Sequence, residues 1–228
     1  METLVNQSLK NIALEKHKVI PVLEKYSLDF CCKGGKTLKQ ACAEKNLELN
    51  DVVEEINTSL GKTTKNVSYN NMSAEQLISY ILIHHHVYVK TNIPVIFNHI
   101  QKVATKHGER FPYIQDVLSL FQEVSVELID HMEKEEKILF PSIKALFSND
   151  EKGQNINLAA PIHVMEMEHE KAGDLLFKIR EITNFYTAPE TACTTHRIML
   201  DELKAFEEDL HQHVHLENNI LFPMAMQN

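Results

Sequence analysis

The chain has 228 residues, of which 43% are hydrophobic, and this suffices for a main domain of roughly 150 residues plus a smaller one. Its formal net charge of -9 argues against nucleic acid as a partner. No segment approaches the ~20 uninterrupted apolar residues of a membrane span, and the first residues lack the apolar core of a signal peptide, so we expect a cytoplasmic protein without a membrane partner.

Histidine and cysteine usage favours metal chemistry over disulfides. The chain has 13 His, only 6 Gly and 7 Pro, and no Trp, a composition that also favours helices. Two of the 4 cysteines are the adjacent Cys31 and Cys32. Because neighbours in sequence are poorly placed to bridge each other, we expect reduced thiols.

Residues 1–60 are predicted to form short helices around the sequence SLDFCCKGG, whose two glycines permit a turn. We therefore expect a small helical N-terminal domain over this range. The polar segment 61–72 is predicted to be an exposed linker. Residues 73–228 would then form the main domain.

Four long helices are predicted in the main domain. The first begins at Ser73, because Ser73-Ala-Glu-Gln76 has the capping-box pattern. The connections are short, so neighbouring helices should be antiparallel, and the expected fold is an all-α, up-and-down four-helix bundle. The expected bounds are 73–106, with a kink allowed at Pro94, then 112–147, 160–185 and 189–226.

Each predicted helix carries an apolar stripe in alternating steps of four and three residues, the spacing that keeps one face toward the bundle axis. In the second helix the stripe continues to Ile138. Every interruption of the stripes is a His or a Glu, and a buried carboxylate is unfavourable unless a counter-charge or a metal compensates it. A shared metal centre accounts for all the interruptions, which are His86, His131, Glu135, His169, His213 and Glu217.

The pattern HxxxExxILFP occurs twice, at 131–141 and 213–223, so the bundle has two similar halves. The spacing places His and Glu one turn apart on one helix face. We therefore expect Glu135 and Glu217 to bridge two metal ions. Four imidazoles and two carboxylates without a thiolate suit iron better than structural zinc or magnesium, so two Fe ions are expected, with manganese as the competitor.

The remaining histidines are assigned other roles. His85 adjoins His86 and is the alternative ligand if the register is wrong by one residue, whereas His107 lies too far along its helix to share the site. Glu166 and Glu168 are either partners of ligating histidines or part of a solvated acidic face. His84 adjoins His86 but falls off the stripe. The histidines assigned to the surface are His17, His99, His163, His196, His211 and His215.

Several segments resemble the repair-of-iron-centres family, di-iron proteins of the ScdA and YtfE type with a hemerythrin-like bundle. They are Tyr26-Ser-Leu-Asp29-Phe30-Cys31-Cys32 before Gly34-Gly35, the HMEKE and HVHLENN stretches at 131–135 and 213–219, and MEHE at 167–170. Lys33 departs from the family, where the cysteines can be followed directly by glycine. The resemblance places the ligands on the same six residues. It also implies repair of iron-sulfur clusters damaged by oxidative or nitrosative stress, by iron donation to damaged iron-sulfur proteins, and a homodimer.

Two other functions remain open. One is an enzyme in which the di-iron site reduces nitric oxide or oxygen, and the other is a hemerythrin-like oxygen carrier or iron sensor. An oxygen-binding bundle has no use for a preceding domain with Cys31 and Cys32, which favours a repair protein that is not an enzyme. The pair would handle iron transiently or exchange thiols, and a structural role as small buried side chains is the alternative.

Overall fold

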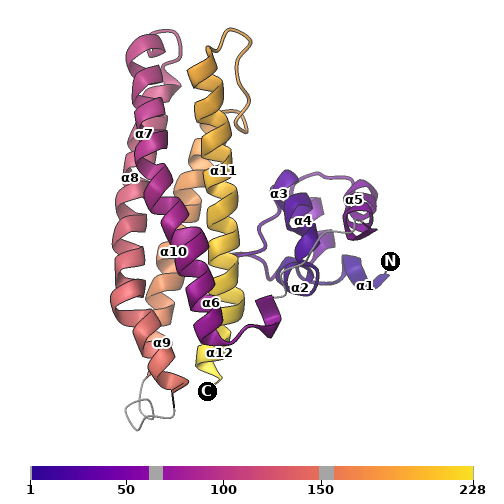
Figure 1. Cartoon of the computed structure of the whole chain (residues 1–228). Helices are drawn as coiled ribbons and strands as arrows, with labels where there is room; N and C mark the ends of the chain where they lie inside the picture. Colours follow the sequence, from indigo (N-terminus) through magenta and orange to yellow (C-terminus); the bar gives the residue numbers. More distant parts are fainter. Residues whose placement is uncertain (1, 62–68, 149–156, 228) are drawn as a thin grey trace.

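The computed structural model describes residues 2–61, 69–148 and 157–227. Four long helical segments stand side by side, and a group of short N-terminal helices lies beside them, next to α11 (Figure 1). Within these ranges the only pairing of extended backbone is an isolated bridge between Ser8 and Thr37. The predicted all-α architecture is confirmed. None of the described helices combines the length and apolar character needed to cross a membrane.

The four long segments surround a common axis in chain order. Contacts join α7 to α8, α8 to α10, α10 to α11, and α11 back to α7, which is the predicted up-and-down bundle. Three of the segments contain a π-helical turn, a turn with one extra residue. In chain order the four long segments are α6 (Ala74–Ile81), η3 (Leu82–His86) and α7 (Val87–His107); α8 (Tyr113–Lys134), η4 (Glu135–Leu139) and α9 (Phe140–Leu146); α10 (Ala159–Ile182), which has no such turn; and α11 (Thr194–Leu216), η6 (Glu217–Leu221) and α12 (Phe222–Met226).

The first long segment begins as predicted. The Ser73 hydroxyl accepts a hydrogen bond from the backbone N–H of Gln76, and the Gln76 side chain accepts one from the backbone N–H of Ser73. This reciprocal capping satisfies two N–H groups that have no partner inside the helix. Helix α7 continues through Pro94.

The connection between α10 and α11 is longer than predicted. Helix α10 ends at Ile182, and α11 begins at Thr194 rather than near residue 189. Residues 184–186 have φ values of 49°, 55° and 58°, a left-handed run that an α-helix does not contain. The Tyr186 hydroxyl donates to Glu207 in α11 at 2.8 Å, which ties this connection to the bundle.

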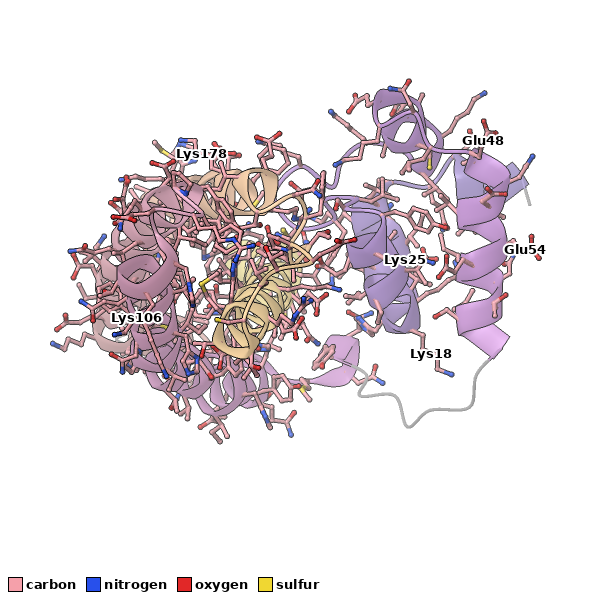
Figure 2. The ribbon with its side chains drawn as sticks, turned by 90° about the horizontal axis from the view of Figure 1, so that it is seen from above. Lys18, Lys25, Glu48, Glu54, Lys106 and Lys178 are labelled. Atoms are coloured by element: carbon pink, nitrogen blue, oxygen red, sulfur yellow. The ribbon has the colours of Figure 1, made fainter. Side chains whose placement is uncertain are left out.

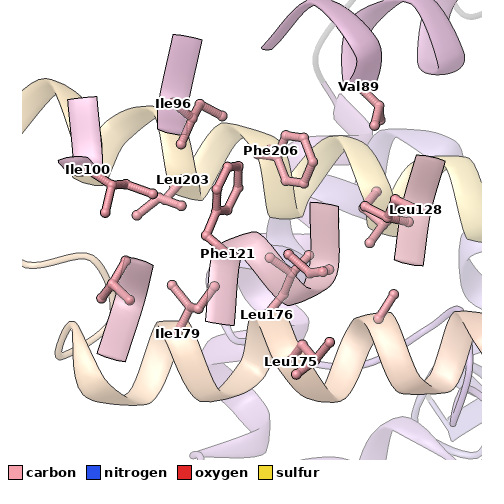
Figure 3. Close-up of a cluster of buried hydrophobic side chains, with 14 of the residues drawn as sticks. Val89, Ile96, Ile100, Phe121, Leu128, Leu175, Leu176, Ile179, Leu203 and Phe206 are labelled. Carbon is pink, nitrogen blue, oxygen red and sulfur yellow. The ribbon is translucent and has the colours of Figure 1, made fainter. Parts of the chain in front are cut away.

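A hydrophobic core fills the upper bundle, and Figure 3 shows apolar side chains of all four helices pointing toward one another. Burial of one such side chain contributes roughly 1.5–3 kcal/mol, so packing stabilises these helices more than intrinsic helix propensity does. The side chains labelled in the figure are Val89, Ile96 and Ile100 of α7, Phe121 and Leu128 of α8, Leu175, Leu176 and Ile179 of α10, and Leu203 and Phe206 of α11.

The N-terminal helices have a separate group of buried apolar side chains, which includes Ile12, Leu23, Leu38 and Ile56. We refer to residues 2–61 as the N-terminal region. Its elements are short, as the sequence predicts. They are α1 (Glu2–Val5), α2 (Leu9–Glu15), η1 (His17–Val19), α3 (Ile20–Lys25), α4 (Leu38–Glu44) and α5 (Leu49–Gly61).

The N-terminal region packs against the bundle, and Figure 2 shows the two side by side from above. His211 Nδ1 of α11 lies 2.9 Å from a carboxylate oxygen of Glu24, and the Asn219 side chain donates to the backbone oxygen of Phe30 at 3.2 Å. Tyr69 of the short helix η2 (Tyr69–Asn71) is buried. Asn70 and Asn71 are exposed, so only Tyr69 of this part of the predicted linker is buried, and residues 62–68 lie outside the described part of the chain.

Candidate metal centre

Six polar residues from all four long segments come together inside the lower bundle. They are the four His and two Glu that interrupt the apolar stripes, and none is more than 2% exposed. His85, the alternative to His86, is also buried, but its Nδ1 pairs with Asp209 Oδ1 at 3.0 Å and it does not join the cluster. The cluster consists of His86, His131, Glu135, His169, His213 and Glu217.

The ligand atoms of the cluster form two groups, and within each group all atoms lie within 4.8 Å of one another. His86 and His213 belong to the first group and His131 and His169 to the second, while Glu135 and Glu217 belong to both.

The two carboxylates face both groups with different oxygens. Glu135 Oε2 lies 3.4 Å from His86 Nε2, and Glu135 Oε1 lies 3.3 Å from His131 Nε2. Glu217 Oε1 lies 3.2 Å from His213 Nε2, and its Oε2 lies 3.1 Å from His169 Nε2. Each carboxylate therefore presents one oxygen to each group, which is the geometry of a bridge.

The π-helical turns lie at the cluster. Turn η4 begins at Glu135, and the N–H of Phe140 donates to the Glu135 carbonyl five residues back; η6 repeats this from Glu217. The extra residue rotates the side chains that follow it. Ile138 is 62% exposed and Leu139 is buried instead, so the predicted inward position of Ile138 is wrong. Such turns often occur at functional sites.

Outer partners orient three of the four imidazoles. His86 Nδ1 lies 2.7 Å from Glu136 Oε1, and His131 Nδ1 lies 2.9 Å from Glu168 Oε2. His169 Nδ1 lies 2.8 Å from Asn218 Oδ1. An Nδ1–H group that donates to these oxygens leaves Nε2 free to face the centre.

Sequence reasoning named only one of these outer partners, Glu168. Glu136 and Asn218 were missed, although each directly follows a cluster carboxylate, and that adjacency was the signal available. Glu166, the other candidate, instead lies 3.9 Å from His163.

The cluster is electrostatically self-compensating. Burial lowers the pKa of His131, but the charges of Glu135 and Glu217 outweigh burial and raise that pKa to about 9. Burial likewise raises the pKa of Glu217, but His213 and His169 outweigh it and hold that pKa well below its usual range. The carboxylates therefore remain ionised in a buried site.

Several atoms of the cluster have no hydrogen-bond partner among the described residues. They include both oxygens of Glu135, Oε2 of Glu217 and Nε2 of His86. Buried polar atoms without partners are unfavourable unless a cation satisfies them. The donor set thus fits metal ions coordinated by imidazole nitrogen and carboxylate oxygen.

Two histidines assigned to the surface are fully buried, so that assignment is wrong for His196 and His215. His196 Nε2 lies 2.8 Å from the Tyr113 hydroxyl, at the far end of the bundle. The His215 ring lies 5.4 Å from that of Phe30 in the N-terminal region. A periodicity argument confined to the bundle does not reveal a residue buried by another part of the chain.

The two adjacent cysteines lie where the N-terminal region meets the bundle. Cys31 is 8% exposed and packs in the bundle core, while Cys32 is half-buried against it. Asp29 Oδ1 accepts hydrogen bonds from the backbone N–H groups of both, each at 3.0 Å. Neither cysteine is part of the two ligand groups, and the four cysteines of the chain are free thiols.

The loop after the cysteines requires glycine at only one of its two glycine positions. A Cβ atom on Gly34 would lie 2.5 Å from the backbone oxygen of Phe30, whereas one on Gly35 would meet nothing within 4 Å. Neither has positive φ, so Gly34 is needed for close approach rather than for its backbone conformation.

Comparison with known proteins gives consistent results over nearly the whole chain. Residues 77–225 match the hemerythrin HHE cation binding domain, and residues 5–60 match ScdA_N, described as a domain of unknown function. The iron-sulfur cluster repair protein YtfE of Cronobacter sakazakii is 34% identical over 221 residues, covering 97% of this chain and 96% of the relative. YtfE of Escherichia coli O81 is 34% identical and that of Escherichia fergusonii 33%, each over 97% of both chains. The chain therefore belongs to the repair-of-iron-centres family, whose members join an ScdA_N domain to a hemerythrin-like cation-binding bundle.

Proposed function

We propose that the cluster holds two iron ions bridged by Glu135 and Glu217. The observation that carries this proposal is that each carboxylate turns one oxygen to each ligand group. Nitrogen and oxygen donors without a thiolate suit iron, whereas structural zinc usually takes one closed set of four ligands. Manganese is the competitor with similar ligand preferences.

We further propose that the protein repairs damaged iron-sulfur clusters, with its own iron as the donated metal. The relatives that align over 97% of this chain are named for that repair. Damaged iron-sulfur proteins are then the partners, and repair takes place under oxidative or nitrosative stress. Iron bound by exchangeable imidazole and carboxylate ligands is a reasonable source for transfer, because protons compete for both ligand types.

The direct test mixes iron-loaded protein with an enzyme whose iron-sulfur cluster has been damaged. We expect the enzyme to regain activity without added iron while iron leaves the repair protein in proportion. No recovery, or recovery without loss of iron, would contradict iron donation. Iron-free repair protein is the matched control.

A second candidate function rests on the number of donors. Each ligand group offers four protein atoms, whereas iron commonly takes up to six ligands, so positions remain for a small molecule. The bound metals would then supply redox chemistry for nitric oxide or oxygen, and the buried carboxylates and imidazoles would hold them. Consumption of nitric oxide by the loaded protein over many turnovers would favour this function.

We also propose that the cysteine pair serves repair rather than assembly of the iron site. Cys31 and Cys32 lie outside both ligand groups, and a thiolate is both a soft ligand and a nucleophile. The double variant Cys31→Ala, Cys32→Ala should keep its iron and lose repair activity. Normal repair by that variant would show that the N-terminal region has another purpose.

The proposed organisation is an N-terminal domain over residues 1–60, a connection over 61–72 and a bundle over 73–228. The separate group of buried apolar residues in the N-terminal region supports it. We also propose a homodimer and a cytoplasmic location, which the resemblance to the family suggests. Light scattering of the full chain tests the dimer.

A further inference from the structure

A cavity of about 310 Å³ lies between the N-terminal region and the bundle. Its walls include Cys32 and apolar side chains such as Leu28, Leu210 and Val214. It is large enough for an amino acid or a short peptide. His169 of the metal cluster also lines it, but the binding of metal ions by the cluster does not account for the rest of this space.

The two thiols at the cavity differ in accessibility. Cys31 packs into the bundle core, and its Sγ lies 3.3 Å from Asp29 Oδ1. A hydrogen bond with Cys32, burial and the neighbouring Asp29 carboxylate raise the pKa of the Cys31 thiol well above its usual value. Cys32 is half-buried and faces the cavity. Both thiols line the cavity, but Cys32 is the more exposed of the two and is therefore the thiol that a molecule there would meet first.

Most charged side chains around the cavity form ion pairs with one another, and Asp29 instead accepts hydrogen bonds from the backbone N–H groups of Cys31 and Cys32. Two others have no such partner. Lys45, at the end of α4, and Glu170 of α10 line the cavity without an ion pair to any described residue. Burial and the charge of Arg180 lower the pKa of Lys45, while Asp29 and Glu44 oppose that shift. The neutralised pairs are Lys33 with Asp174, Lys36 with Glu44, Arg180 with Glu207, and His211 with Glu24.

We propose that this cavity binds a low-molecular-weight amino-acid or peptide disulfide, and that Cys32 exchanges with it. Lys45 would pair with a carboxylate of the ligand, Glu170 with its ammonium group, and the apolar wall would contact the carbon chain. A zwitterionic ligand matches one free cation and one free anion on opposite elements. The proposal does not depend on iron or on repair activity.

The exchange balances without a further reagent. The Cys32 thiolate attacks one sulfur of the disulfide, a bond forms between Cys32 and that sulfur, and the original S–S bond breaks. The other half leaves as a thiolate and takes up the proton that Cys32 lost. The Cys32 sulfur is oxidised and the leaving sulfur is reduced.

The test uses the full-length reduced protein and two disulfides. Oxidised glutathione carries carboxylates and ammonium groups, whereas cystamine carries only ammonium groups. Mass spectrometry of the intact chain and of its peptides follows the rate and the position of the adduct. Cys193, a half-buried thiol elsewhere in the chain, is the internal reference.

We expect oxidised glutathione to modify Cys32 before Cys31 and Cys193. The change Lys45→Gln should slow that reaction by roughly two- to fivefold, the size of one exposed ion pair, and should leave the cystamine reaction unslowed. Lys39→Gln, an exposed lysine of the same helix that does not line the cavity, is the matched control and should change neither rate. Equal modification of Cys32 and Cys193, or no effect of Lys45→Gln on either disulfide, would overturn the proposal.

Discussion

The bridging role of Glu135 predicts that one substitution weakens two metal sites at once. Glu135→Gln keeps the size of the side chain but removes its charge and one carboxylate oxygen. Since Glu135 belongs to both ligand groups, one group loses its oxygen donor and the other keeps only a neutral amide oxygen in place of a carboxylate oxygen. His86→Ala, in contrast, removes a donor from one group only.

The expected loss of metal affinity can be bounded from the smaller loss that removal of an outer hydrogen-bond partner causes. Loss of an outer hydrogen-bond partner lowers metal affinity by about 10- to 100-fold, so loss of a direct charged ligand should exceed about 100-fold, or about 2.7 kcal/mol, at each ion. Dialysis against a graded series of chelator, followed by iron analysis, measures this. At a chelator concentration that leaves the native protein fully loaded, Glu135→Gln should be nearly empty and His86→Ala about half loaded.

His163→Ala is the control, because His163 is an exposed histidine on the same helix as His169. It should retain the native iron content at every chelator concentration. If Glu135→Gln keeps one ion with native affinity, the carboxylate serves a single metal and the bridged arrangement is wrong. Circular dichroism of each variant separates loss of metal from loss of fold.

Three further predictions concern the surroundings of the centre. Glu136→Gln should lower iron affinity by about 10- to 100-fold, because it weakens the hydrogen bond that orients His86, and chelator competition measures it. Glu207→Ala should lower the free energy of unfolding by about 3–5 kcal/mol in urea, because it leaves the guanidinium of Arg180 buried without its partner, while Glu208→Ala should change it by less than about 1 kcal/mol. Deletion of residues 1–60 should leave a helical bundle that still binds iron but melts at a lower temperature, and a bundle as stable as the full chain would contradict the packing of the two regions.

The sequence predicts which six side chains gather inside the bundle because the signals for them are local. Burial of an isolated imidazole or carboxylate in an apolar stripe is unfavourable. The six polar positions in the stripes are therefore expected to lie together and to share a partner. The two copies of HxxxExxILFP add the symmetry of two half-sites. Helical spacing then suffices to place the side chains at one level of the bundle.

Other features depend on distant parts of the chain or on small backbone changes. A π-helical turn adds one residue to a helical turn, and the sequence pattern contains no signal for it. The inward position therefore moves from Ile138 to Leu139. His215 is buried because Phe30 of another region packs against it. The early end of α10 at Ile182 reflects a left-handed run at 184–186, where Phe185 and Tyr186 give no propensity signal for positive φ.

The central claim is that this bundle holds two iron ions between shared carboxylates. Metal analysis of the full-length protein, purified from cells grown with ample iron and combined with its visible spectrum, tests that claim directly. We expect about two irons per chain, one for each ligand group, with the visible absorption of a carboxylate-bridged ferric pair. One zinc ion per chain, without that absorption, would contradict it.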